Sequence, residues 1–127
     1  MYEKLGGEEK IRFMVDDLME GFMGDKELAW HHRKFQDPDQ MDMLKEKMFQ
    51  FFKFKLGGSK RYIGISIAEV HADMNISNAL FDTACEMILK SVKKIKPKPP
   101  VLREFIKMVQ SLRPEICIMN PKVSELV

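Results

Sequence analysis

The sequence has few of the residues that form disulfide frameworks or structural metal sites. Only two cysteines, Cys85 and Cys117, occur in 127 residues, and they do not form a CxxC pair. This spacing excludes the disulfide framework of a small secreted protein and argues against a structural zinc site. Reduced thiols fit a cytoplasmic protein, and we expect that location.

Long apolar runs and a strong excess of one charge are also missing. No apolar run approaches the ~20 residues of a membrane span, and the N-terminal MYEKLGGEEK has no apolar signal core. Lys and Arg total 21 against 19 for Asp and Glu, a formal net charge of +2. Such a small excess does not favour a nucleic-acid partner. We therefore expect neither a membrane nor a nucleic acid as partner.

Period-two alternation is absent as well, which argues against a sheet. The short segment RYIGI has no second strand to pair with, so we interpret it as an extended loop. With 45% hydrophobic residues, the chain can bury one real core. The fold class expected is all-α.

Apolar residues at helical spacing predict the first long helix, from about Glu8 to Met23. A short helix is expected over 25–30, and the following HHRKFQ is interpreted as a loop. The next helix is expected from Pro38, capped by Asp37, to the Gly57-Gly58 pair. Its predicted apolar face comprises Met41, Leu44, Met48, Phe51 and Phe52.

The second half of the chain shows similar start and stop signals. Ser66 and Glu69 form a capping-box pattern that opens a helix of at most about eight residues. Ser77 caps a long helix that ends at KPKPP, and a last helix should end before Pro114. We expect one domain over residues 1–113 and an irregular tail over 114–127.

Several ordered motifs resemble the group I truncated haemoglobins. They are YEKLGGEE at the start, LKEKM…FF…LGG from Leu44 to Gly58, YIG from Tyr62, and the run AEVHADMNIS. Each motif alone is weak, but the ordered set is much more specific. The resemblance implies a truncated globin fold, a two-over-two helical sandwich that binds haem b (iron protoporphyrin IX).

By this resemblance, His71 binds the haem iron from the proximal side. Imidazole suits this role because its unperturbed pKa of about 6.5 leaves it largely neutral near pH 7. The resemblance also implies a haem cage of apolar and aromatic residues, each of which could equally be simple core. The cage positions are Phe51, Phe52, Tyr62, Ile67, Val70, Ile76, Phe81 and Ile88. Lys47, Lys60 and Arg61 are either partners of the haem propionates or ordinary surface charges.

The distal side departs from the family pattern. Where group I relatives commonly carry a tyrosine and glutamines, this chain has Met19, Leu44 and Met48. None of these side chains can donate a hydrogen bond to a gas ligand. Losing such a bond costs roughly 1.5–3 kcal/mol, or about one to two decades in oxygen affinity. We expect fast oxygen release and comparatively good carbon monoxide binding.

A residue of the chain could instead occupy the sixth iron position. Lys47 would have to lose its proton, at a cost of about 4.6 kcal/mol at pH 7, so pairing with a propionate is the preferred role. Thioether sulfur from Met19 or Met48 is another possibility, as are His31 and His32 in the loop. The residue covering the haem edge is expected to be Phe35, with Trp30 as the alternative.

Two functions compete. One is a haem protein that binds oxygen, nitric oxide or carbon monoxide, with a possible reductase partner and possible consumption of nitric oxide. The other is a degenerate globin without haem that acts as a protein-interaction module, with some of its 11 methionines filling the pocket. No catalytic triad, paired carboxylates or HExxH motif supports another enzyme class. The oligomeric state stays open.

Overall fold

Helices account for all the regular elements that the computed structural model describes, in residues 1–64, 66–72 and 74–117. In chain order they are η1 (Glu3–Leu5), α1 (Gly7–Gly24), α2 (Lys26–His31), η2 (Arg33–Gln36), α3 (Pro38–Lys55), α4 (Ile67–His71), α5 (Asn78–Lys94), α6 (Pro99–Gln110) and α7 (Arg113–Ile116). The expected all-α class is confirmed. None of the helices in the described ranges has the length and apolar character needed to span a bilayer.

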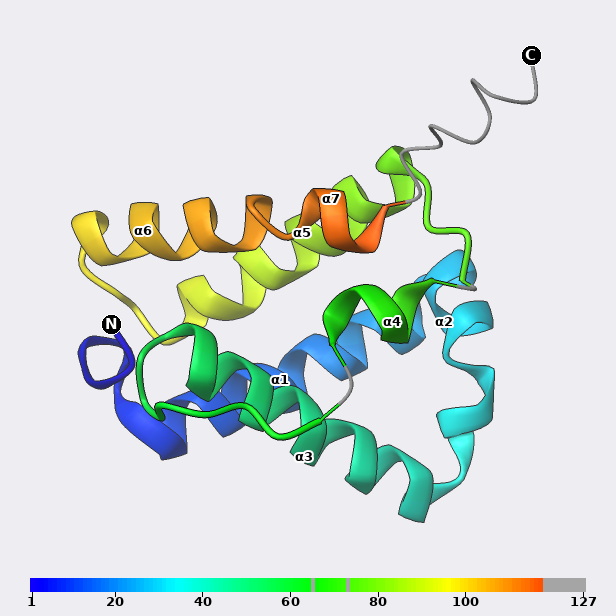
Figure 1. Ribbon diagram of the computed structural model, residues 1–127, viewed down its shortest axis with the longest axis horizontal. Coiled ribbons are helices and arrows are strands. Elements are labelled where there is room, and N and C mark those ends of the chain that lie inside the picture. Colours follow the sequence, from blue (N-terminus) through cyan, green and yellow to red (C-terminus); the bar gives the residue numbers. More distant parts are fainter. Residues whose placement is uncertain (65, 73, 118–127) are drawn as a thin grey trace.

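The long helices form two pairs (Figure 1). Helix α1 packs on α3 in one layer, α5 packs on α6 in the other, and α1 lies against α5 between the layers. The two-over-two arrangement is therefore confirmed. The short α4 packs against α7 at the side of this sandwich.

Side-chain caps start the helices where the sequence predicted. Asp37 accepts a hydrogen bond from the backbone N–H of Gln40 at 3.1 Å, at the start of α3. The Ser66 hydroxyl caps α4 by accepting a hydrogen bond from the backbone N–H of Glu69 at 3.1 Å. The Ser77 hydroxyl caps α5 by accepting from the backbone N–H of Leu80. Each cap satisfies a donor that the first helical turn would otherwise leave without a partner. These caps set the direction of α4, which carries His71.

The start of the chain packs against the Gly57-Gly58 end of α3. Gly57 ends α3 with a φ of 86°, a left-handed conformation that strains any residue with a Cβ. A Cβ on Gly58 would lie 2.6 Å from the Cγ of Tyr2, so the ring packs directly on this glycine. Tyr2 also donates its backbone N–H to the carbonyl of Leu56 at 2.8 Å. The start of the chain is thereby fastened to the end of α3.

Two segments differ from the sequence prediction. Residues 33–36, expected in a loop, form the 3-10 helix η2. The backbone N–H of Phe35 donates to the carbonyl of His32, and the Arg33 guanidinium donates to the carbonyl of Trp30. Residues expected at the start of the irregular tail form α7, and Cys117 pairs with Ile76 in an isolated β-bridge. The rest of that tail, 118–127, lies outside the described residues.

The predicted face of α3 was partly wrong. Its most buried side chain is Phe49, which the predicted apolar face omits, whereas Leu44 and Met48 are only half-buried. Phe49 faces α1, where the guanidinium of Arg12 lies 3.8 Å from its ring centroid. Helix α3 thus turns its strongest apolar face toward α1 and leaves a half-buried one beside it.

Candidate functional site

His71 is the last residue of α4 and is held in one orientation by its own helix. Its Nδ1 lies 2.8 Å from the carbonyl oxygen of Ile67. Because a carbonyl can only accept, Nδ1 carries the proton, and Nε2 of the neutral ring keeps its lone pair. Metal-binding histidines commonly show this arrangement.

Burial keeps this ring neutral. Desolvation lowers the pKa of His71 below its usual range, and the hydrogen bond to Ile67 offsets this only in part. A neutral imidazole with a free Nε2 is a competent ligand for iron at neutral pH. His71 therefore has both the protonation state and the orientation that its predicted role requires.

The surface beside His71 is apolar and incompletely covered. Ile67 is half-buried, and Val70 is 48% exposed although it is β-branched and apolar. The helical neighbour of α4 is α7, so the α4 side chains are not buried by close packing on α3. Uncovered apolar surface next to His71 suits a flat hydrophobic group better than it suits water.

The structure brings together two of the predicted cage aromatics. The rings of Phe51 and Tyr62 meet edge to face, with centroids 5.7 Å apart. Tyr62 also contacts Phe54, at 5.8 Å. These contacts tie α3 to the extended segment that leads into α4.

Other predicted cage residues lie in the core. Phe52 stacks on Phe105 of α6 with ring centroids 6.2 Å apart. Phe81 is buried beneath the Arg113 guanidinium, and Ile76 is buried at its bridge to Cys117. These three side chains each contact other residues of the protein, so their predicted place in a haem cage stays a prediction.

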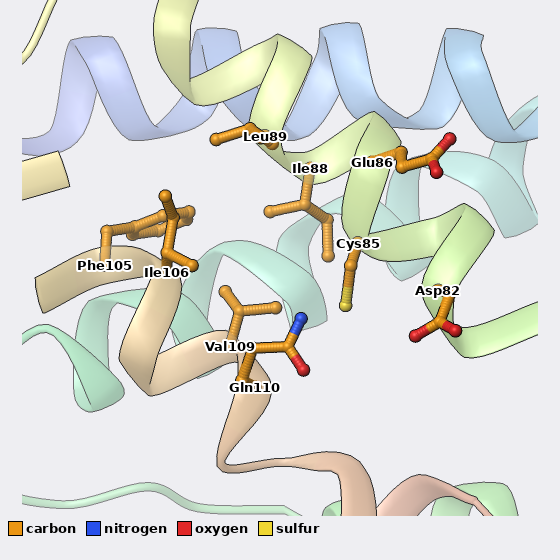
Figure 2. A pocket seen from close by; sticks show the side chains of 9 residues that line it. All are labelled: Asp82, Cys85, Glu86, Ile88, Leu89, Phe105, Ile106, Val109 and Gln110. Carbon is orange, nitrogen blue, oxygen red and sulfur yellow. The ribbon is translucent and has the colours of Figure 1, made fainter. Parts of the chain in front are cut away.

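Ile88 lines a cleft between α5 and α6 (Figure 2). This cleft has a volume of about 340 Å³, and the Cys85 and Val109 side chains point into it beside Ile88. Burial raises the pKa of the Cys85 thiol to about 11, which makes it a poor nucleophile at neutral pH. Histidine is absent from the described residues that line the cleft.

The sequence did not distinguish His32 from its neighbour His31, but the structure does. Nδ1 of His32 lies 2.7 Å from the Leu28 carbonyl, and its ring packs between Phe22 and Phe35. His31 instead packs edge-on against Trp30, which is 58% exposed. The spacing of four residues from Leu28, a buried helical position, was the signal that could have identified His32.

His32 is electrostatically coupled to His71. Burial is the main reason that the pKa of His32 is lowered, and the nearby charges of His31 and His71 lower it further. Phe35 is half-buried beside His32, whereas Trp30 lies at the surface. Lys47, Lys60 and Arg61 are all exposed.

Comparison with known proteins identifies the family. The family model described as "Bacterial-like globin" matches residues 1–117. This chain belongs to the bacterial-like globin family. The match includes α7 and the bridge residue Cys117, beyond the domain end expected at residue 113.

Relatives of this globin are group I truncated haemoglobins. One, the "Group 1 truncated hemoglobin" of Tetrahymena pyriformis, is 28% identical over 116 residues, which are 91% of this chain and 93% of the relative. Its crystal structure in the Fe(III) form has a TM-score of 0.78 and covers 91% of this chain and 96% of its own. The 2/2 hemoglobin of Synechococcus sp. PCC 7002, with covalently attached heme, is 22% identical, covers 88% of this chain and 91% of its own, and has a TM-score of 0.75. That second likeness supports the fold alone.

The distal positions of this globin, as mapped by resemblance, differ in burial. Met19 is 1% exposed and packed into the core, whereas Leu44 and Met48 are half-buried on α3. Neither a thioether nor an aliphatic side chain contains an N–H or O–H group that could donate a hydrogen bond.

Proposed function

We propose that this globin binds haem b, with His71 as the proximal iron ligand, and that the iron binds a diatomic gas on its other side. The orientation of His71 is the observation that carries this proposal. Its Nδ1–H is engaged by Ile67, and its Nε2 lone pair is free at a half-buried position. When bound, haem supplies an iron atom that can bind oxygen, nitric oxide or carbon monoxide reversibly.

The residues around His71 fit such a group. Val70 and Ile67 on α4, with Leu44 and Met48 on α3, provide apolar side chains that the protein does not bury fully. The two cysteines do not form the CxxCH motif, so attachment of the haem through c-type thioether bonds is not expected. Lys47, Lys60 and Arg61 are exposed cations suited to pairing with the propionates.

The backbone of α4 has a defined part in this function. The Ile67 carbonyl fixes the tautomer and rotation of the His71 ring, as hydrogen-bond acceptors commonly do for the second ring nitrogen of metal-binding histidines. Ser66 holds the first turn of the same five-residue helix. Ring orientation therefore depends on an intact α4, with no further side chain required.

Gas binding would take place without a hydrogen bond from the positions that commonly provide one in the family. Met19, Leu44 and Met48 supply none, which favours fast oxygen dissociation and a relative preference for carbon monoxide. A reductase would be needed to keep the iron ferrous for these gases. We propose the cytoplasm as the location because reduced thiols persist there.

Titration of the purified protein with hemin tests the proposal. The expected result is a Soret band that saturates at one haem per chain and is lost or strongly weakened by His71→Ala. His31→Ala is the matched control, since His31 packs on the exposed Trp30 and should leave haem binding unchanged. An absence of specific haem binding in the wild-type protein would support the haem-free interaction module instead.

A further inference from the structure

We propose that Arg113 is a positioning residue for His71, although the two residues belong to different helices. The Arg113 side chain fastens α7 to α5, and α7 is the helix on which α4 packs. The consequence for the iron rests on the proposed haem function, whereas the fastening of α4 does not. Loss of Arg113 should leave the ligand in the chain but let the helix that carries it move.

Helix α7 has little stability of its own. It has only four residues, and no described side chain caps its start. Pro114 has no backbone N–H, so it cannot continue the hydrogen bonds of α6 into α7. Isolated helices shorter than ~12–15 residues are marginal in water even with favourable sequences. The position of α7 must therefore come from contacts with other parts of the fold.

Arg113 supplies such contacts at the start of α7. Its guanidinium donates to Asn78 at 3.0 Å and to Asp82 at 2.5 Å, both on α5, and to Gln110 at 3.0 Å at the end of α6. The guanidinium also lies 4.5 Å from the ring centroid of Phe81, which is buried. A planar fork of donors can make these contacts together, which the single ammonium of a lysine does less well. The Arg113 side chain is 27% exposed, so water screens its ion pair only in part.

The other end of α7 is fastened to the segment that follows α4. The backbone N–H of Cys117 donates to the Arg113 carbonyl at 2.8 Å, and Cys117 pairs with Ile76 in the β-bridge. The Cys117 thiol donates to the Ser77 carbonyl at 3.8 Å. Ile76 and Ser77 lie between α4 and α5. A displacement of α7 would therefore displace the segment that leads away from His71.

Helix α4 depends on this neighbour for its place in the fold. It has five residues, and α7 is the described helix that it contacts most extensively. Figure 1 shows α4 at the side of the sandwich, next to α7. The Ile67 carbonyl sets the orientation of the His71 ring within α4, but not the place of α4 relative to the long helices. Arg113 acts on that place through α7.

Arg12 provides a matched control because it makes the same kinds of contact elsewhere. Its guanidinium pairs with Glu8 at 2.9 Å and with Glu46 at 2.7 Å, and it lies 3.8 Å from the ring centroid of Phe49. The contacts with Glu46 and Phe49 join α1 to α3 and involve neither α4 nor α7. A general loss of stability should therefore appear in both Arg12→Gln and Arg113→Gln. Loosening of α4 should appear in Arg113→Gln alone.

Amide hydrogen exchange, measured by nuclear magnetic resonance on the full-length protein before haem is added, tests the fastening of α4. The backbone N–H of Val70 donates to the Ser66 carbonyl at 3.0 Å and reports on the opening of this helix. We expect it to exchange about tenfold faster in Arg113→Gln than in the wild-type protein, because contacts to a charged group are lost. Arg12→Gln should leave the exchange rate of Val70 unchanged.

The haem-reconstituted proteins test the consequence for the iron. Arg113→Gln should lose haem to an excess of apomyoglobin about tenfold faster than the wild-type protein, a factor that changes around a metal ligand commonly produce. The iron–histidine stretching band of the ferrous protein, measured by resonance Raman spectroscopy, should broaden and move to lower frequency. Arg12→Gln should retain the wild-type values of both quantities.

The outcomes separate this inference from the haem function. Unchanged exchange at Val70 and an unchanged stretching band in Arg113→Gln refute the inference, and so do equal changes in Arg12→Gln. If Arg113→Gln does not fold, Asp82→Ala decides, because it removes one contact of Arg113 and should change both quantities in the same direction by a smaller factor. A wild-type protein that binds no haem refutes the proposed function, and hydrogen exchange then tests the fastening of α4 by itself.

Discussion

Asp17 links the two layers of the fold, and its removal should destabilise the protein by an amount that the structure sets. One carboxylate oxygen accepts from the Ser91 hydroxyl and the other from Lys94 Nζ, both at 2.7 Å. Asp17 belongs to α1 and its two partners belong to α5. Ser91 is 2% exposed, whereas the Lys94 side chain is 55% exposed.

The two contacts of Asp17 contribute differently to the free energy of unfolding because they differ in burial. A buried hydroxyl bonded to a carboxylate contributes about 1.5–3 kcal/mol, and its loss leaves Ser91 without that acceptor. The exposed ion pair with Lys94 is screened by water and adds at most about 1 kcal/mol. Asp17→Ala should therefore lower the free energy of unfolding by about 2–4 kcal/mol. Asp17→Asn retains an acceptor for Ser91 and should cost clearly less.

Urea denaturation followed by circular dichroism measures both variants. The hydrogen bond from Lys94 is the largest influence that lowers the pKa of Asp17, so the stabilisation is present above the unfolded pKa and is lost as pH falls through the folded one. The difference between wild type and Asp17→Asn should thus shrink toward acid pH. Equal losses for the alanine and asparagine variants, or a loss below ~1 kcal/mol for alanine, would refute the reasoning.

Three further predictions follow from separate sites. Leu44→Gln places an amide donor on the half-buried face of α3. It should slow oxygen dissociation from the haem-loaded protein by about 10–100-fold, as measured by stopped flow. Met43→Gln, at an exposed position, is the control and should leave the dissociation rate unchanged. Gly57→Ala should lower stability by about 1 kcal/mol in thermal unfolding, because open space surrounds the position but its φ is +86°. Burial raises the pKa of Cys85 to about 11. In the native protein this thiol should therefore react with iodoacetamide at pH 8 roughly 100-fold more slowly than in the urea-unfolded protein. Similar rates in the native and unfolded protein would contradict the burial of the thiol.

Local chemistry explains why the helix boundaries were predictable. Asp37, Ser66 and Ser77 cap helices in the structure at the positions where the sequence placed helix starts. A cap satisfies a backbone donor only a few residues away, so tertiary context has little influence on it. The left-handed conformation at Gly57 is similarly local. The same reasoning located His71 at the end of a short helix.

Side-chain partners were less predictable because they depend on packing between distant segments. Phe49 follows Met48 directly and falls outside a narrow stripe of spacing three and four, yet it is buried because α1 approaches that side of α3. Phe52 stacks on Phe105, 53 positions further along the chain, a partner that the sequence did not indicate. Sequence periodicity identifies which helix face is apolar, but not which neighbour covers each part of it.

Backbone carbonyls explain why the rings of His71 and His32 are hydrogen-bonded in the same way. A carbonyl oxygen has two lone pairs, so it can accept the Nδ1–H of a histidine four residues later in addition to a backbone N–H. His71 uses Ile67 at the end of α4, and His32 uses Leu28 immediately after α2. In both cases the backbone hydrogen bond sets which ring nitrogen keeps its lone pair free.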